Sequence, residues 1–136
     1  MDSNQIVVYT SMVGDLFHIG HLNLLRKSRS LGTKLIVGVI EDTCVKSYKG
    51  RFPVFNMRER MEIISAISGV DDVISQYNRD GSDNLRSLGN VDIVTRGDDT
   101  ILENEKNYIE GIGGKYILLP RTVGKKKKKR LGIIKI

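Results

Sequence analysis

The amino-acid sequence predicts a three-layer α/β fold with a five-stranded, mainly parallel sheet. Short apolar runs rich in Val, Ile and Leu recur along the chain, and they alternate with segments whose apolar residues have helical spacing. Strands that are apolar on both faces are typical of parallel sheets covered by helices on each side. The 136 residues suffice for one core, so we predict a single domain over residues 1–136.

The first third of the chain predicts a β-α-β unit. Residues 6–9 (IVVY) form a short β-branched run that is typical of a buried strand. A helix is expected to begin near Gly20 and to end at Gly32, a residue type that often terminates helices. Residues 34–40 (KLIVGVI) indicate a second buried strand, which should run parallel to the first.

The remainder of the chain continues the alternation after a long polar connection. Residues 41–55 are rich in Lys, Arg, Gly and Pro and are expected to form a loop. Asn56 and Glu59 fit a capping box at the start of a helix over residues 57–68. Further strands are expected at residues 73–74, 92–95 and 115–119, and further helices at residues 82–88, 102–109 and 131–136.

The net charge of +6 is concentrated in one place. The run KKKKKR at residues 125–130 holds six of the 22 basic residues, and the other 16 equal the 16 acidic residues in number. A nucleic-acid-binding face across the domain is therefore not expected, and nucleic acid is an unlikely partner. We expect the segment from Lys125 to Ile136 to be a basic tail. Repulsion between its like charges favours disorder.

Other features favour a cytoplasmic protein. The polar start of the chain does not resemble a signal peptide, and no apolar run approaches the length of a membrane-spanning helix. Cys44, the single cysteine, cannot form an internal disulfide, and no Cys/His cluster has the spacing of metal ligands. A buried or bystander thiol is favoured over a nucleophile, which would need a histidine near it in space.

Four polar segments follow predicted strands and should meet at one edge of the sheet. They are DLFHIGH, the loop with Lys49 and Arg51, RGDD, and PRTVG. Ligands of open parallel sheets bind at the carboxyl ends of the strands, so these segments form the candidate site.

His18 and His21 stand at the expected start of the first helix, separated by Ile19 and Gly20. Two imidazoles beside a helix N-terminus can donate hydrogen bonds to a phosphate whose charge grows during phosphoryl transfer. Gly20 allows the backbone to approach such a ligand closely. The alternatives are a metal-binding pair or two structural histidines.

The segment DLFHIGH followed by LNLLRKSRSLGTKLIVGV resembles the cytidylyltransferase-like family of HxGH nucleotidyltransferases. The basic loop with RER, then GDD and PRTVG, occur in the family's order and spacing, and the similarity runs from residue 6 to about residue 124. The chain is most similar to the glycerol-3-phosphate cytidylyltransferase type, whose members are homodimers. The resemblance implies a Rossmann-like fold of the nucleotidylyl transferase type and a homodimer.

The resemblance also implies a reaction, in which a substrate phosphate attacks the α-phosphate of a nucleoside triphosphate and pyrophosphate leaves. The implied catalytic residues are His18, His21, Lys49 and Arg121, with Lys49 also binding the acceptor. The implied nucleotide-binding residues are Val13, Gly14, His18, His21, Arg51, Asp98, Arg121, Thr122 and Gly124. Mg²⁺ is expected with the triphosphate, held largely by phosphate oxygens, because no dedicated metal cage is visible. Lys49 and Arg51 could instead be solvated charges.

The sequence departs from the family pattern at three places. Val13 and Gly14 stand where the family usually has Thr and Phe, and Ser68 stands where the glycerol-3-phosphate type has Arg. The lysine run follows RTVG in place of phosphate-binding hydroxyls. These lysines could replace the hydroxyls as phosphate ligands, could mark an altered end that weakens the enzyme, or could contact nucleic acid or an anionic membrane.

The leading hypothesis is a cytidylyltransferase that moves CMP from CTP to a phosphorylated small alcohol such as glycerol 3-phosphate. An adenylyltransferase of the same fold, with a sugar-phosphate or FMN acceptor, is the alternative within enzymes. A non-catalytic nucleotide-binding module and a nucleic-acid-binding protein that uses its tail are the alternatives outside them.

Overall fold

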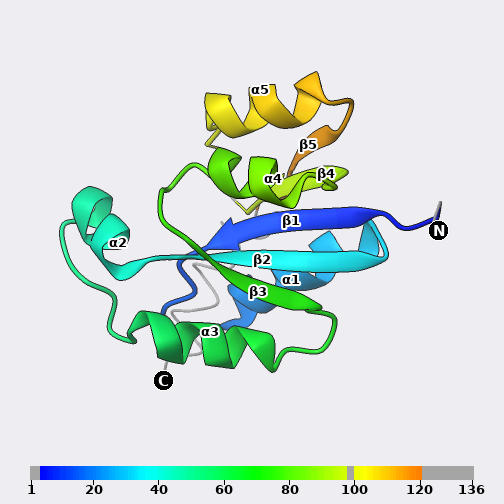
Figure 1. Ribbon diagram of the computed structural model, residues 1–136. Helices are drawn as coiled ribbons and strands as arrows, with labels where there is room; N and C mark the ends of the chain where they lie inside the picture. The colour runs from blue at the N-terminus through cyan, green and yellow to red at the C-terminus, as the bar shows by residue number, and fades with distance from the viewer. Residues whose placement is uncertain (1–3, 98–99, 121–136) are drawn as a thin grey trace.

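The computed structural model describes residues 4–97 and 100–120 of the chain. The expected α/β architecture is confirmed in this part of the chain (Figure 1). The elements are β1 (Val7–Met12), α1 (Ile19–Ser30), β2 (Lys34–Ile40), α2 (Asp42–Lys49), α3 (Met57–Ser65), β3 (Asp72–Gln76), α4 (Ser82–Leu88), β4 (Ile93–Arg96), α5 (Glu103–Gly111) and β5 (Lys115–Leu118).

The five strands form one sheet in the order β3-β2-β1-β4-β5, and every neighbouring pair is parallel. The central strand is β1, in which Val8 lies opposite Leu35 of β2 and Ile93 of β4. The direction of strand order reverses at β1, which makes the β1/β4 boundary the switch point where open α/β sheets bind ligands. All carboxyl ends lie at the same edge, from which α2 projects (Figure 1).

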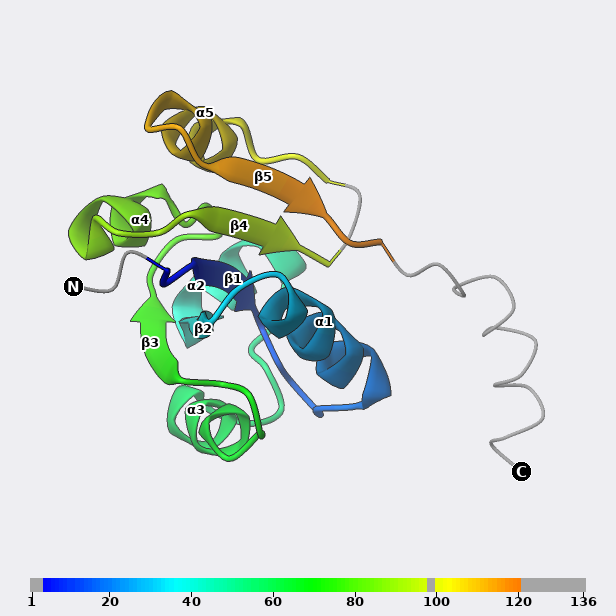
Figure 2. The ribbon, with the colours of Figure 1, turned by 90° about the vertical axis from the view of Figure 1, so that its right-hand side faces the viewer.

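Helices cover both faces of the sheet and create two separate cores. Figure 2 shows α1 and α3 on one side of the sheet and α4 and α5 on the other. Successive β1 residues serve opposite cores, because side chains alternate along a strand: Tyr9 packs with Leu85 and Ile109, whereas Val8 packs with Leu25 and Ile64. The expected three layers are thus confirmed.

The prediction of a loop over residues 41–55 was wrong for its first half, which forms α2. Glu41 caps this helix by accepting hydrogen bonds from the backbone amides of Thr43 and Cys44. Gly50 ends it in the left-handed conformation, with φ of 83°. Within α2 the buried side chain is Val45, so the apolar stripe was too narrow to reveal a helix.

The other boundaries differ from expectation by a few residues, except those of β2 and α4, which match. Gly32 does not cap α1; Leu31 does, with right-handed geometry. A glycine is needed at 32 because a Cβ there would lie 2.6 Å from the carbonyl oxygen of Ile6. The helix expected at residues 131–136 lies outside the described residues.

A buried polar network joins the strands on the α4/α5 side. The Tyr9 hydroxyl donates to Gln76 at 2.6 Å and accepts from Asn84 at 2.9 Å. Glu105, which is almost fully buried, accepts a hydrogen bond from the Tyr116 hydroxyl at 2.6 Å. Burial raises the pKa of both tyrosines. These satisfied contacts hold the strand ends in fixed positions.

No helix in the described ranges is both long enough and apolar enough to cross a lipid bilayer.

Candidate active site

The carboxyl edge of the sheet brings together segments that are distant in sequence. The connection from β1 to α1 supplies Val13, Gly14 and His18, and the first turn of α1 supplies His21. Lys49 and Arg51 come from the end of α2 and the connection that follows it. Four further predicted site residues lie outside the described residues, namely Asp98, Arg121, Thr122 and Gly124.

His18 and His21 form a reciprocal cap at the start of α1. His18 Nδ1 accepts a hydrogen bond from the Gly20 amide at 3.0 Å, and His21 Nδ1 accepts one from the His18 amide at 3.1 Å. Because Nδ1 accepts in both rings, Nε2 is the nitrogen through which each ring can donate a hydrogen bond. The Gly20 amide thus donates to the His18 ring in this structure.

The two imidazoles lie close to each other. Their ring centroids are 4.1 Å apart, and the ring of Phe17 stacks on His21 at 5.2 Å. His18 is exposed and His21 is partly buried. A pair of adjacent imidazole donors at the positive end of a helix suits an anion better than a cation.

Asp15 joins the histidine segment to the connection that follows α2. Its carboxylate accepts hydrogen bonds from the backbone amides of Val54 at 2.8 Å and Phe55 at 2.9 Å. Burial is the largest single influence and acts to raise the pKa of Asp15, whereas these two hydrogen bonds act to lower it. The positive charge of Arg60 adds to their effect, and the pKa lies below its ordinary value.

Arg60 of α3 links the backbone at several strand ends from inside the protein. Its side chain is 0% exposed and donates to the carbonyl oxygens of Val13 at 2.7 Å, Ile40 at 2.8 Å and Phe55 at 3.0 Å. The same guanidinium forms an ion pair with Asp42 of α2. Asp15 and Arg60 together hold the β1–α1 and α2–α3 connections against each other.

The backbone of the β1–α1 connection is constrained at two positions. Gly14 has φ of 67°, and a Cβ there would lie 2.7 Å from Ile64 Cδ1. Leu16 has φ of 49°, which is unusual for a residue with a side chain, and it is 53% exposed. Strained backbone of this kind is concentrated at functional sites.

Lys49 is the last residue of α2 and not part of a loop, and both it and Arg51 are exposed. The structure places them at the same edge as the histidines, on the β2 side. Lys46, one turn before Lys49, lies over the exposed ring of Phe52 at 5.4 Å.

Sequence reasoning missed Asp15, Asp42 and Arg60 as site-forming residues. A signal for Arg60 was present, since it lies four residues before Ile64 on the apolar face of its helix, where a charged residue must find partners. Asp15 opens the DLFHIGH segment, but no role was assigned to it, and nothing in the local sequence marked Asp42; their partners lie up to 40 residues away.

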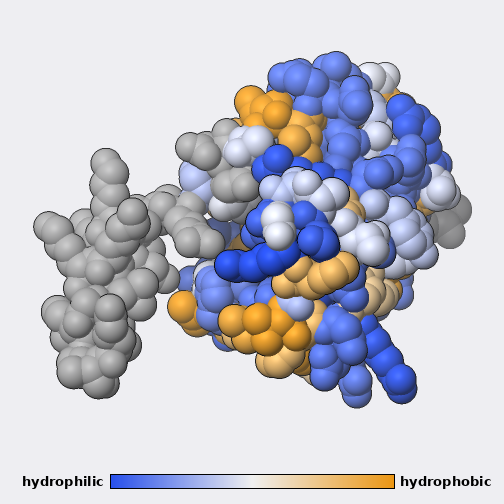
Figure 3. Space-filling view, turned by 90° about the vertical axis from the view of Figure 1, so that its left-hand side faces the viewer, coloured by the Kyte–Doolittle hydropathy of each residue, from blue (hydrophilic) through white to orange (hydrophobic). Residues whose placement is uncertain are grey.

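The carboxyl edge is mainly hydrophilic. Figure 3 looks onto this side of the molecule and shows polar residues over much of its centre, with apolar patches nearby. Among the described residues, no group of three or more His, Cys, Asp or Glu side chains is arranged to hold a metal ion.

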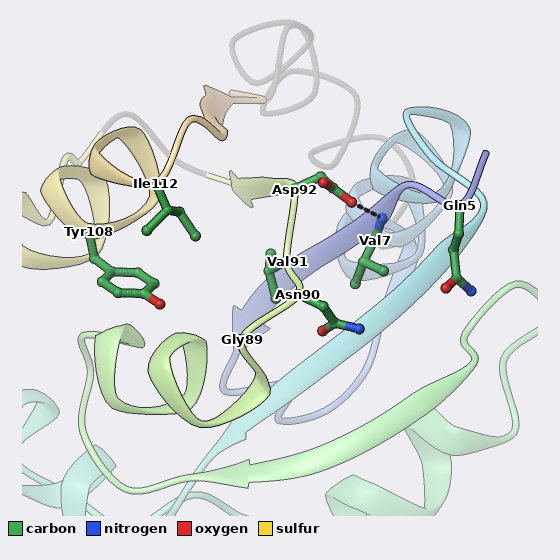
Figure 4. A pocket seen from close by; sticks show the side chains of 8 residues that line it. All are labelled: Gln5, Val7, Gly89, Asn90, Val91, Asp92, Tyr108 and Ile112. Atoms are coloured by element: carbon green, nitrogen blue, oxygen red, sulfur yellow. Dashed lines mark hydrogen bonds between the residues drawn. The ribbon is translucent and has the colours of Figure 1, made fainter. Parts of the chain in front are cut away.

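An open hollow of ≈ 450 Å³ lies at the opposite edge of the sheet (Figure 4). Its lining includes Val7 at the start of β1, Asp92 just before β4, and Tyr108 of α5. The Asp92 carboxylate accepts a hydrogen bond there from the backbone amide of Val7 at 2.8 Å. The hollow is thus remote from the carboxyl ends, where parallel sheets bind their ligands.

A parallel sheet of this order, with HxGH at the start of the helix after its central strand, defines a nucleotidyltransferase-type α/β domain. The chain belongs to the cytidylyltransferase-like family, whose profile matches residues 14–130. This confirms the resemblance found in the sequence, and the family is one of enzymes.

Relatives with several named activities are similar to the chain. A bifunctional protein HldE of Desulfatibacillum aliphaticivorans is 38% identical over 84% of this chain and 24% of the relative. An ethanolamine-phosphate cytidylyltransferase of Dictyostelium discoideum is 32% identical over 89% of this chain and 32% of the relative. A FAD synthase of Pyrococcus abyssi is 32% identical over 98% of this chain and 93% of the relative.

A solved structure has the same fold. The lipopolysaccharide core biosynthesis protein of Thermoplasma volcanium superposes with a TM-score of 0.73 at 30% identity, covering 84% of this chain and 95% of that one. By contrast, the chain spans only about a quarter of the HldE relative and a third of the ethanolamine-phosphate relative.

Proposed function

We propose that the protein transfers CMP from CTP to a phosphorylated small alcohol and releases pyrophosphate. The observation that carries the proposal is the reciprocal cap formed by His18 and His21, which presents two Nε2 donors at the N-terminus of α1. Such donors stabilise charge that develops on the α-phosphate oxygens in the transition state. The position of this helix next to the β1/β4 switch point supports a nucleotide there.

The reaction is a single displacement. An oxygen of the acceptor phosphate attacks the α-phosphorus of CTP, a new P–O bond forms, and the bond to the β-phosphate breaks. The electron pair of that bond leaves with pyrophosphate. The role of the protein is to position both substrates and to balance negative charge, so no covalent intermediate with a side chain is needed.

Lys49 contributes a cation near both phosphates in this proposal, and Arg51 contributes a second one to the nucleotide. Val13 and Gly14 bring backbone close to the nucleotide. For the residues outside the described ranges, we propose that Asp98 lies near the ribose, and that Arg121, Thr122 and Gly124 hold base and phosphates. Mg²⁺, held mainly by phosphate oxygens, would neutralise charge on the triphosphate.

The preference for CTP is supported by the family and by the ethanolamine-phosphate cytidylyltransferase relative. The FAD synthase relative, whose length the chain nearly matches, favours the second candidate, adenylyl transfer from ATP to FMN. The proposed setting is cytoplasmic, and the proposed assembly is a homodimer.

A matrix of substrates tests the proposal. The full chain is incubated with Mg²⁺, with CTP or ATP, and with glycerol 3-phosphate, ethanolamine phosphate or FMN, and pyrophosphate release is measured. We expect release with CTP and a phosphorylated alcohol, and mass spectrometry should identify the CDP-linked product. The His21→Ala variant provides the inactive control.

Two outcomes would contradict the proposal. Turnover with ATP alone would replace cytidylyl by adenylyl transfer. Binding of CTP in calorimetry with no pyrophosphate from any pair would identify a non-catalytic nucleotide-binding module.

A further inference from the structure

Among the described residues, no carboxylate pairs with Arg79, a cation at the carboxyl edge. It follows β3, and its guanidinium lies over the ring of Tyr48 of α2, with Cζ 4.9 Å from the ring centroid. Tyr48 directly precedes Lys49 on that helix. Within residues 4–97 and 100–120, no carboxylate lies within ion-pair distance of Arg79, and no hydrogen-bond acceptor is used by its guanidinium.

The backbone beneath this side chain is held firmly. The side-chain amide of Gln76, a buried residue, donates a hydrogen bond to the backbone carbonyl oxygen of Arg79 at 3.0 Å. The backbone N–H of Arg79 faces the sulfur of Cys44. The next residue, Asp80, accepts from the amides of Ser82 at 2.8 Å and Glu105 at 3.0 Å. A charged side chain on a backbone held in a fixed position is typical of a residue that recognises a ligand.

The charges around Tyr48 single out Arg79. Burial is the largest influence on the pKa of Tyr48 and raises it. The positive charge of Arg79 is the next largest influence and lowers this pKa, and Arg96 and Arg60 lower it by less. Arg96 is paired with Glu105 at 3.4 Å, and Arg60 is paired with Asp42. Of these three arginines, Arg79 is the one without a carboxylate partner in the described part of the chain, so it can pair with an external anion.

The position relative to Lys49 indicates which substrate Arg79 would meet. The nucleotide is proposed at the β1/β4 switch point, whereas Arg79 lies on the other side, at the ends of β2 and β3. A guanidinium stacked on an aromatic ring still offers its edge N–H groups, which match a carboxylate or phosphate in two-point contact.

We propose that Arg79, stacked on Tyr48, binds a second anionic group of the acceptor, so that the acceptor is a small phosphate ester that also carries a carboxylate or another phosphate. This inference rests on the proposed function and narrows its substrate class. An acceptor with a cationic head, such as ethanolamine phosphate, is disfavoured because its ammonium group would face the guanidinium.

A second arginine–tyrosine pair provides a matched control. Arg86 lies over Tyr108 at 5.2 Å, yet Arg86 is also paired with Asp83 at 3.4 Å, and this pair belongs to α4 and α5. Loss of Arg86 removes the same type of stack without removing a charge that lacks a carboxylate partner among the described residues.

The test compares two nearly isosteric probes that differ by one carboxylate. Calorimetry measures the Kd of glycerol 3-phosphate and of 3-phosphoglycerate for the full chain with Mg²⁺ and the non-transferring analogue α,β-methylene-CTP. We expect 3-phosphoglycerate to bind on the order of tenfold more tightly, the scale of a charge-assisted contact. Arg79→Gln should abolish this difference and leave the Kd of the CTP analogue unchanged, and Arg86→Gln should preserve the difference.

Equal affinities of wild-type protein for the two probes would overturn the inference. A preference that survives Arg79→Gln, or an equal loss of CTP-analogue binding in that variant, would overturn it as well. Because the readout is binding, the preference can stand even if the substrate matrix gives no pyrophosphate, and the two proposals therefore fail separately.

Discussion

Arg60 of α3 and Asp42 of α2 form an ion pair in which the arginine side chain is entirely buried. The pair connects two helices that flank the candidate site, and the arginine also serves backbone carbonyls of neighbouring segments. The architecture of the site therefore depends on an internal charge at least as much as on the residues that would face a substrate.

Replacement of Arg60 by alanine should lower the free energy of unfolding by about 3–5 kcal/mol, because Asp42 and three carbonyl oxygens lose their donor. Urea denaturation followed by circular dichroism measures the change. Arg58→Ala, at an exposed position of the same helix, is the control and should stay within about 0.5 kcal/mol of wild type. An equally small change in Arg60→Ala would contradict the assigned role.

Loss of either histidine should reduce turnover by ~10²-fold or more, the effect of removing a transition-state hydrogen-bond donor. His18→Asn separates catalysis from capping, because asparagine is a good N-cap residue but offers no imidazole. We expect this variant to keep the stability of wild type and to lack its activity in the pyrophosphate assay. Full activity in His18→Ala and His21→Ala would exclude the proposed role.

Asp15 should make the stability of the folded protein depend on pH in the acidic range. Its pKa is lower in the folded protein than in the unfolded chain, so its contribution is fully present above the unfolded pKa of about 3.9 and is lost as pH falls through the folded pKa. Asp15→Asn should therefore be less stable than wild type at pH 7, with a smaller difference near pH 3. Urea midpoints at the two pH values measure this, and Asp83→Asn on the surface of α4 serves as the control. A difference that does not shrink in acid would argue against the assignment.

Lys49→Ala should decrease kcat/KM by ~10²-fold because a cation next to both substrate phosphates is lost. Lys46→Ala is matched to it, since both lysines lie in the last turn of α2. We expect Lys46→Ala to retain near-normal steady-state kinetics. Equal effects of the two substitutions would mean that only the general positive charge of α2 matters.

The sequence predicted the sheet and its helices well because buried parallel strands and amphipathic helices leave strong local patterns. The run at residues 34–40 coincides with β2, and residues 82–88 coincide with α4. The helix α2 escaped prediction because it buries one residue, Val45, and its polar composition resembles a loop.

The histidine segment was found from the sequence because both histidines belong to one short motif. The residues that brace it were not, since Asp15 bonds to Val54 and Phe55, and Arg60 reaches Val13 across the fold. The role proposed for Arg79 likewise depends on its contact with Tyr48, which lies on a separate helix. Contacts of this type depend on tertiary structure, which local patterns do not encode.

The carbonyl groups of Val13, Ile40 and Phe55 belong to three different stretches of chain yet share one guanidinium. A fluctuation that withdraws this donor releases all three stretches at the same moment. The rim of the domain should therefore open as one cooperative unit, and backbone amides on separate strand ends should exchange their hydrogens with solvent at similar rates.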